Sequence, residues 1–173
     1  MTIHHQCAAA DTALFRRVMG RFTTGVTVIA AEVDGLIRGM TANAFMSGSL
    51  TPPLCILSVA KRARLHDSLM RAGRFGVSML AQGQEAVSAH FAGQSADHVA
   101  IEFESVASVP LLKNASAAIA AKIEASHGCG DHTLFIGRII HMQDNDRAPL
   151  VYQSGRYGAF VSNQTPESTI EFW

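Results

Sequence analysis

The chain has 173 residues, of which 48% are hydrophobic, so it is long and apolar enough to form one domain with a sizeable core. Its 14 Lys and Arg residues balance its 14 Asp and Glu residues, which argues against nucleic acid as the main partner. Charged residues make up only 16% of the chain, below the roughly 25% typical of globular domains, and this hints at surface buried between copies of the chain.

The cysteines and the N-terminal residues indicate the cellular compartment. Cys7, Cys55 and Cys129 are scattered without a CxxC pair, so neither a zinc ribbon nor a thioredoxin motif is available. An odd number of widely spaced cysteines fits a reducing cytoplasm. No apolar run near the start is long enough to span a bilayer, and the first ten residues lack the apolar segment of a signal peptide. The sequence therefore predicts a cytoplasmic protein with no membrane association.

The N-terminal part of the chain predicts a flexible arm followed by one helix. Residues 1–11 are polar and non-periodic and form the expected arm. Asp11 or Thr12 can cap a helix that ends near Gly20. One face of this helix is apolar and comprises Leu14, Phe15, Val18, Met19 and Phe22.

Strand signals follow directly. Residues 25–31 are β-branched and apolar and predict a strand, and residues 36–42 predict its hairpin partner. Between them, Asp34-Gly35 supplies the positive φ angles that a tight hairpin turn needs. Residues 54–59 predict a short buried strand, after the proline pair 52–53 has ended any regular ladder.

The middle of the chain alternates between helical and strand patterns. Residues 62–72 and 82–91 predict helices, each followed by a glycine, and residues 75–80 predict a strand between them. Residues 94–118 are the least periodic part of the chain and predict long loops.

Two more strand pairs complete the prediction, 119–126 with 133–141 and 150–153 with 157–161. About seven short strands and three helices without βαβ alternation predict a mainly β fold, an antiparallel barrel or sandwich with flanking helices. We expect residues 12–162 to form this domain and the polar residues 163–173 to form a C-terminal tail.

Several nucleotide-binding and hydrolase motifs are missing. The nearest match to GxGxxG, at residues 128–133, lacks the third glycine and precedes a strand rather than a helix. There is no GxxxxGK[ST] motif and no GxSxG motif. Any nucleotide must therefore bind to something other than a glycine-rich helix start.

Two polar segments are candidates for binding a cofactor. Residues 39–49 concentrate hydroxyl, amide and small side chains that suit the polar edge of a flat ring, although an ordinary polar loop has the same composition. Residues 58–66 place basic side chains before a predicted helix, which suits a phosphate, although a solvated basic turn is the alternative.

Two further segments are more ambiguous. His127, Cys129 and His132 resemble metal ligands, but no fourth ligand lies at a recognisable spacing, so we predict no metal site. Asp131 beside His132 at the start of a strand is a more plausible polar site, with an exposed turn histidine as the alternative. Arg156 and Tyr157 could cover an aromatic cofactor or simply lie on a surface hairpin.

Taken together and in this order, these segments resemble the flavin reductase-like family, the small reductase components of two-component flavin-dependent monooxygenases. No single motif is decisive, but seven occur in register over roughly residues 12–160. The matching segments are residues 15–29, 39–47, 52–54, 73–77, 90–93, 130–137 and 150–157.

The resemblance implies a homodimeric, FMN-binding split β-barrel with flavin near the subunit interface. It implies that residues 40–49 line the flavin, that the segment from Ser58 faces the ribityl–phosphate end, and that residues 90–91 close part of the pocket. His132 would lie on the nicotinamide side as the catalytic residue. The implied cofactor-binding residues are Met40, Thr41, Ala42, Asn43, Ala44, Ser47, Ser49, Ser58, Lys61, Arg62, His90, Phe91 and Tyr157.

The implied activity is hydride transfer from NADH or NADPH to FMN or FAD, with reduced flavin passed to a partner monooxygenase. Residues 63–65, Ala-Arg-Leu, lack the small hydroxyl side chains found in many relatives, which leaves FMN and FAD both open. The sequence also leaves open a non-catalytic flavin sensor or carrier. Another split-barrel oxidoreductase, either pyridoxamine-phosphate-oxidase-like or deazaflavin-using, is the remaining alternative.

Overall fold

The computed structural model describes residues 11–94 and 99–162. The arm predicted over residues 1–11 and the tail predicted over 163–173 lie outside the described residues, apart from Asp11. Asp11 caps the first helix, because its carboxylate accepts hydrogen bonds from the backbone N–H groups of Ala13 and Leu14. Within the described residues no helix is both long and apolar enough to cross a membrane.

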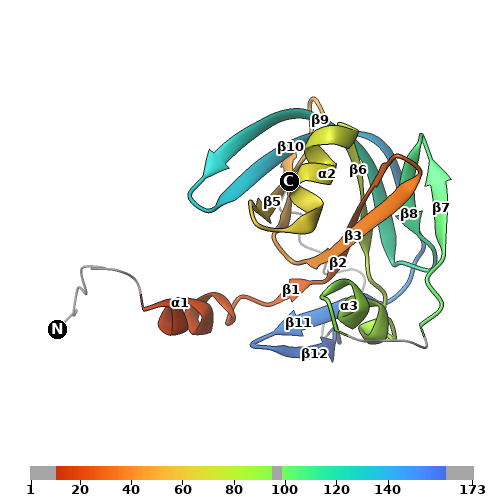
Figure 1. Ribbon diagram of the computed structural model, residues 1–173. Coiled ribbons are helices and arrows are strands. Elements are labelled where there is room, and N and C mark those ends of the chain that lie inside the picture. The colour runs from red at the N-terminus through yellow and green to blue at the C-terminus, as the bar shows by residue number, and fades with distance from the viewer. Residues whose placement is uncertain (1–10, 95–98, 163–173) are drawn as a thin grey trace.

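One antiparallel sheet forms most of the molecule (Figure 1). Its seven strands are ordered β3-β2-β6-β9-β10-β5-β4, and the sheet curves around a core in which Phe75, Phe135 and Leu57 are fully buried. The strands span β2 Thr27–Val33, β3 Leu36–Ala42, β4 Phe45–Ser49, β5 Leu54–Ala60, β6 Arg74–Met79, β9 Ala117–Cys129 and β10 His132–Asp144.

Two smaller sheets flank the large one. Strand β1, Thr24–Gly25, pairs with β11, Leu150–Gln153, which pairs with β12, Arg156–Ala159. Strands β7, Phe103–Val106, and β8, Val109–Leu112, form a hairpin that packs against the side of the large sheet (Figure 1). All four residues of β8 are buried, so this hairpin belongs to the core.

Three helices lie outside the sheets. Helix α2, Arg64–Ala72, buries Leu65 and Leu69 against the main core and ends at Gly73 in the left-handed conformation. Helix α3, Glu85–Phe91, lies beside β11 and β12 (Figure 1). Helix α1, Thr12–Met19, projects from the body and buries none of its residues, so its apolar face is exposed.

The sequence predictions agree with this architecture in kind but not in number. The structure confirms the two hairpins predicted over residues 25–42 and 150–161, and it confirms the three predicted helices. The prediction of about seven strands was wrong, because the described residues contain twelve. Residues 94–118 were predicted as loops but include β7 and β8, and the polar segment 39–49 includes β4.

Candidate functional site

The connection between β3 and β4 lies against the end of β5. Thr27 Oγ1 donates a hydrogen bond of 2.7 Å to the Ala42 carbonyl, which fixes the end of β3. The backbone N–H of Ser58 donates to the Ala44 carbonyl at 3.0 Å, so Asn43 and Ala44 are held beside Ser58. The structure thus brings together three of the residues that the resemblance assigned to the flavin.

Lys61 joins the end of β5 to the β9–β10 turn. Its backbone N–H donates to the Asp131 carbonyl at 2.9 Å, and its Nζ donates to the Gly130 carbonyl at 2.7 Å. Helix α2 begins directly afterwards, and its cap residue Ala63 offers no side-chain acceptor to the first turn. Because the first N–H groups of a helix have no partner within the helix, Lys61, Arg62 and this terminus form a basic, donor-rich corner.

His132 lies at the same corner and is oriented by its neighbour. Its Nδ1 is 2.7 Å from the Asp131 carboxylate. This hydrogen bond, together with the charge of a protonated His132, lowers the pKa of Asp131 below its usual value. His132 pairs with Ala60 and Leu134 pairs with Ser58, so His132 and Ser58 lie on one face of adjacent strands.

A second group of predicted residues surrounds helix α3. Thr41 Oγ1 donates to the Ser88 carbonyl at 2.6 Å, and the Tyr157 hydroxyl donates to Ser88 Oγ at 2.9 Å. The Phe91 ring packs on Gly39, where an added Cβ would lie 2.7 Å from a ring carbon. His90 is exposed and contacts Phe91 edge-on. Ser88 of α3 is therefore hydrogen-bonded to β3 through Thr41 and to β12 through Tyr157.

The other predicted flavin residues contribute differently. Met40 and Ala42 are half-buried and pack with their side chains on the main core. They would therefore meet a ligand chiefly through their backbones. Ser47 and Ser49 lie on β4, and the pairing register of β4 with β5 shifts between these two residues. Ser47 is exposed and Ser49 is half-buried, so both lie at the accessible edge of the sheet.

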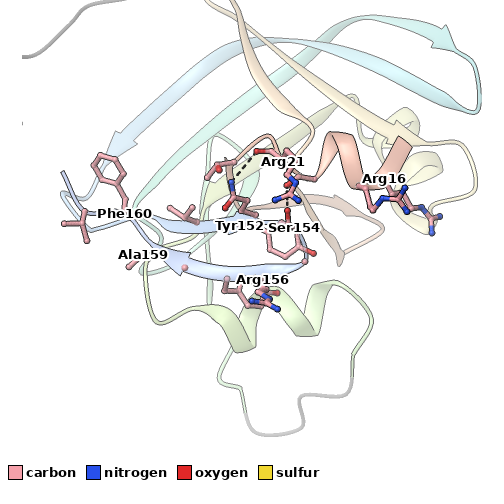
Figure 2. Close-up of a pocket in the computed structure, with 16 residues that line it drawn as sticks. Arg16, Arg21, Tyr152, Ser154, Arg156, Ala159 and Phe160 are labelled. Carbon is pink, nitrogen blue, oxygen red and sulfur yellow. Dashed lines mark hydrogen bonds between the residues drawn. The ribbon is translucent and has the colours of Figure 1, made fainter. Parts of the chain in front are cut away.

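Sequence reasoning missed two features of this region. Ser88 is 1% exposed, and nothing in its sequence neighbourhood distinguishes it from an ordinary helix residue. The second feature is the arginines of the first helix, a segment in which the apolar face is the prominent sequence pattern. They line a cavity of about 1190 Å³ between α1 and the β11–β12 hairpin (Figure 2). In the sequence, the signal for this cavity is the presence of basic residues on the side of the helix opposite its apolar face.

The β9–β10 turn carries the three residues that resemble metal ligands in the sequence, His127, Cys129 and His132. Across the described ranges, no three His, Cys, Asp or Glu residues are gathered in a way that could hold a metal ion. His127 and Cys129 lie on β9, where His127 pairs with Leu134 and Cys129 pairs with His132.

Comparisons with known proteins agree with this geometry. Residues 19–160 match the model of the flavin reductase-like domain. The chain is 41% identical over 145 residues to an NADH-dependent flavin reductase of a Rhodococcus species, covering 82% of each protein. It is 42% identical over 148 residues to the reductase component of 4-hydroxyphenylacetate 3-monooxygenase from Thermus thermophilus, covering 85% of this chain and 95% of that protein.

Solved structures lead to the same family. Flavin reductase PheA2 in its native state superimposes with a TM-score of 0.85 at 39% identity, covering 88% of this chain and 99% of that one. The mainly antiparallel split barrel expected from the sequence is thereby confirmed. With the family model matching most of its length and close relatives covering more than four fifths of it, this chain belongs to the flavin reductase-like family.

Proposed function

We propose that this protein is an NAD(P)H-dependent flavin reductase that transfers hydride from a nicotinamide to FMN or FAD. The observation that carries the proposal is the corner where His132, oriented by Asp131, adjoins the basic start of α2 in a member of this family. The related Rhodococcus protein is named as NADH-dependent, and the Thermus relative is a reductase component of a monooxygenase. A partner monooxygenase that receives the reduced flavin is therefore part of the proposal.

The residues present fit a flavin phosphate at the start of α2. The helix terminus is uncapped by any side chain, and the adjoining Lys61 and Arg62 are exposed cations. Backbone N–H groups at a helix start, flanked by basic side chains, bind phosphate oxygens. Ser58, Asn43 and Ala44 lie next to this corner and would hold the ribityl chain and ring edge.

The protein's own contribution to the reaction is to bind the flavin and the nicotinamide and to orient their rings. Bound flavin supplies the hydride acceptor, so no side chain needs to act as a nucleophile. When His132 is neutral and its Nδ1–H donates to Asp131, its Nε2 is left as a hydrogen-bond acceptor. We propose that this nitrogen accepts a hydrogen bond from the carboxamide of the nicotinamide and so fixes the orientation of that ring.

A spectrophotometric assay tests the activity directly. Purified protein is mixed with NADH or NADPH and with FMN or FAD, and the absorbance of the reduced nicotinamide is followed. Flavin-dependent loss of this absorbance is expected, and the four pairings identify the preferred cofactors. Flavin binding without turnover in any pairing would favour the sensor or carrier. Binding of a deazaflavin in preference to FMN, or FMN-dependent oxidation of pyridoxine phosphate, would favour another split-barrel oxidoreductase.

Replacing His132 by alanine is expected to raise KM for the nicotinamide roughly fivefold, because one oriented hydrogen bond is worth about 1 kcal/mol. The affinity for flavin should stay the same. Steady-state kinetics and fluorescence titration with FMN measure the two effects. His127→Ala is the matched control, since it removes an exposed histidine from the neighbouring strand. Steady-state kinetics unchanged by His132→Ala would remove this residue from the site.

We further propose a homodimer and a cytoplasmic location. Apolar side chains of α1 and of the turn after it support the dimer, because Phe15 and Val18 on α1 and Phe22 in the turn are each more than half exposed. Exposed apolar side chains in such a group are typical of surfaces covered by another chain. The scattered cysteines, of which Cys55 is buried and Cys129 is exposed, support a reducing compartment.

A further inference from the structure

Helix α2 is joined to the start of β10 by a histidine. The side chain of His66 is 16% exposed, and its ring lies edge-on to the fully buried Phe135 ring, with centroids 5.5 Å apart. Its Nε2 lies 2.9 Å from Thr133 Oγ1. Among the described residues this is the only side-chain hydrogen bond between α2 and β10. His66 is therefore the polar side chain that holds the first turn of α2 against β10.

Asp67 sets the direction of this hydrogen bond. Its Oδ1 is 3.2 Å from His66 Nδ1. A carboxylate only accepts hydrogen bonds, so neutral His66 carries its proton on Nδ1 and donates it to Asp67. Nε2 is then left as an acceptor, and the Thr133 hydroxyl donates to it.

Thr133 connects His66 to the nicotinamide side of the candidate site, because it directly follows His132 on β10. Successive side chains of a strand point to opposite faces of the sheet. Thr133 is 8% exposed and points to the core face, toward His66, whereas His132 shares the other face with Ser58. One peptide unit separates the two Cα atoms, so a displacement at Thr133 also displaces His132. His66 thus supports His132 from the core side of the strand.

The β9–β10 turn and α2 are also anchored independently of His66. The backbone N–H of Lys61 donates to the Asp131 carbonyl and its Nζ donates to the Gly130 carbonyl, so the turn is joined to the end of β5. Leu65 is buried in the main core and anchors α2. Replacing His66 or Thr133 should therefore leave the fold intact and alter only how closely α2 and β10 are held.

We propose that His66 is a positioning residue, which acts through Thr133 to hold His132 at a fixed distance from the first turn of α2. The inference rests on the proposed function, in which His132 orients the nicotinamide and the start of α2 binds the flavin phosphate. Hydride transfer requires the two rings to be close and aligned. The groups that place these rings lie on different elements, β10 and α2, and the His66–Thr133 hydrogen bond fixes one element against the other.

Thr133→Val tests the proposal, because valine has nearly the shape of threonine but lacks the hydroxyl group. The affinity of the FMN-loaded protein for NAD+ is measured by calorimetry, and KM for NADH is measured in the steady state. The loss of one hydrogen bond should weaken NAD+ binding and raise KM about three- to fivefold. The value of kcat and the affinity for FMN should each change less than about twofold, because Lys61, Arg62 and the start of α2 are intact.

Two variants of His66 test the hydrogen bond from its other side. His66→Ala should have the same effect as Thr133→Val, whereas His66→Gln should bring NAD+ affinity to within about twofold of the unmodified protein, since its amide can bond the Thr133 hydroxyl. Arg71→Ala is the matched control, because it removes another side-chain contact of α2, an exposed ion pair with Asp34 near the far end of the helix. Its NAD+ affinity should change less than about twofold.

The same substitution in a His132→Ala background separates positioning from a general structural effect. If Thr133 acts through His132, Thr133→Val should not weaken NAD+ binding further once His132 has been removed. An equal loss of affinity with and without His132 would overturn the proposal, and so would unchanged affinity and KM in Thr133→Val when the unmodified protein is active. Neither NAD+ binding nor turnover by the unmodified protein would instead overturn the proposed function, and this inference with it.

Discussion

Phe75→Ala is expected to lower the free energy of unfolding by about 3–5 kcal/mol, the range found for buried phenylalanines. The Phe75 ring is fully buried on β6 and reaches across Ala121 of β9 to Gly137 of β10. A Cβ added at Gly137 would lie 2.7 Å from the ring and 3.0 Å from the Ala121 methyl. The ring therefore fills the space that this glycine leaves, and alanine would leave a cavity across three strands.

Urea unfolding at a fixed protein concentration measures this loss. Phe160→Ala is the control, because its side chain is 65% exposed and its replacement should change stability by less than about 0.5 kcal/mol. Equal unfolding midpoints for the two variants would show that the core does not depend on the Phe75 ring.

Gly76→Ala is expected to be at least as damaging, with a cost of about 3 kcal/mol or more. An added Cβ would lie 2.3 Å from the Pro110 carbonyl oxygen and 2.8 Å from Leu111 Cδ2. The first of these is a backbone atom of β8, which cannot move without shifting the β7–β8 hairpin. All of β8 is buried, so the shift would disturb the core.

Gly25→Ala is the matched control for this prediction, because an added Cβ at Gly25 has nothing within 4 Å. Thermal unfolding of both variants, followed by circular dichroism, gives the comparison. A melting temperature for Gly76→Ala equal to that of Gly25→Ala would mean that β8 does not pack closely on β6.

Local signals explain which strands could be predicted. The hairpin of β2 and β3 has β-branched strands on both sides of Asp34-Gly35, and the predicted second strand, 36–42, has the bounds found in the structure. The hairpin of β11 and β12 has Ser154 and Gly155 at positive φ, the backbone conformation of a tight hairpin turn. In both cases the chain pairs with its immediate neighbour, so a short window of sequence contains the whole motif.

The missed strands depend on distant contacts. Strand β4 has two large apolar residues, Phe45 and Met46, followed by three small ones, and three of its five positions are exposed; it is extended because it pairs with β5. Strand β8 contains Pro110 and only four residues, and it is held by packing on β6. Neither strand has the alternation that would distinguish it from a loop, so tertiary contacts decide its conformation.

The candidate site was partly predictable for the same reason. Family resemblance indicated the individual segments, and the structure shows that Asn43 and Ala44 adjoin Ser58 and that Lys61 adjoins Asp131. The role of Ser88 was not predictable, because its partners Thr41 and Tyr157 are 47 and 69 positions away in the sequence. Periodicity carries no information about such a contact.

Pairing of β1 with β11 has a consequence for folding during synthesis. Thr24 pairs with Tyr152, so the small sheet joins one of the first strands to one of the last. Ribosomes add about 5–20 residues per second, so β1 leaves the ribosome several seconds before its partner is made. Until then the nascent chain lacks the β11–β12 hairpin and, with it, Tyr157. Any ligand that contacts this hairpin can therefore stabilise the protein only after translation has passed it, and such a ligand cannot assist the earlier folding of the large sheet.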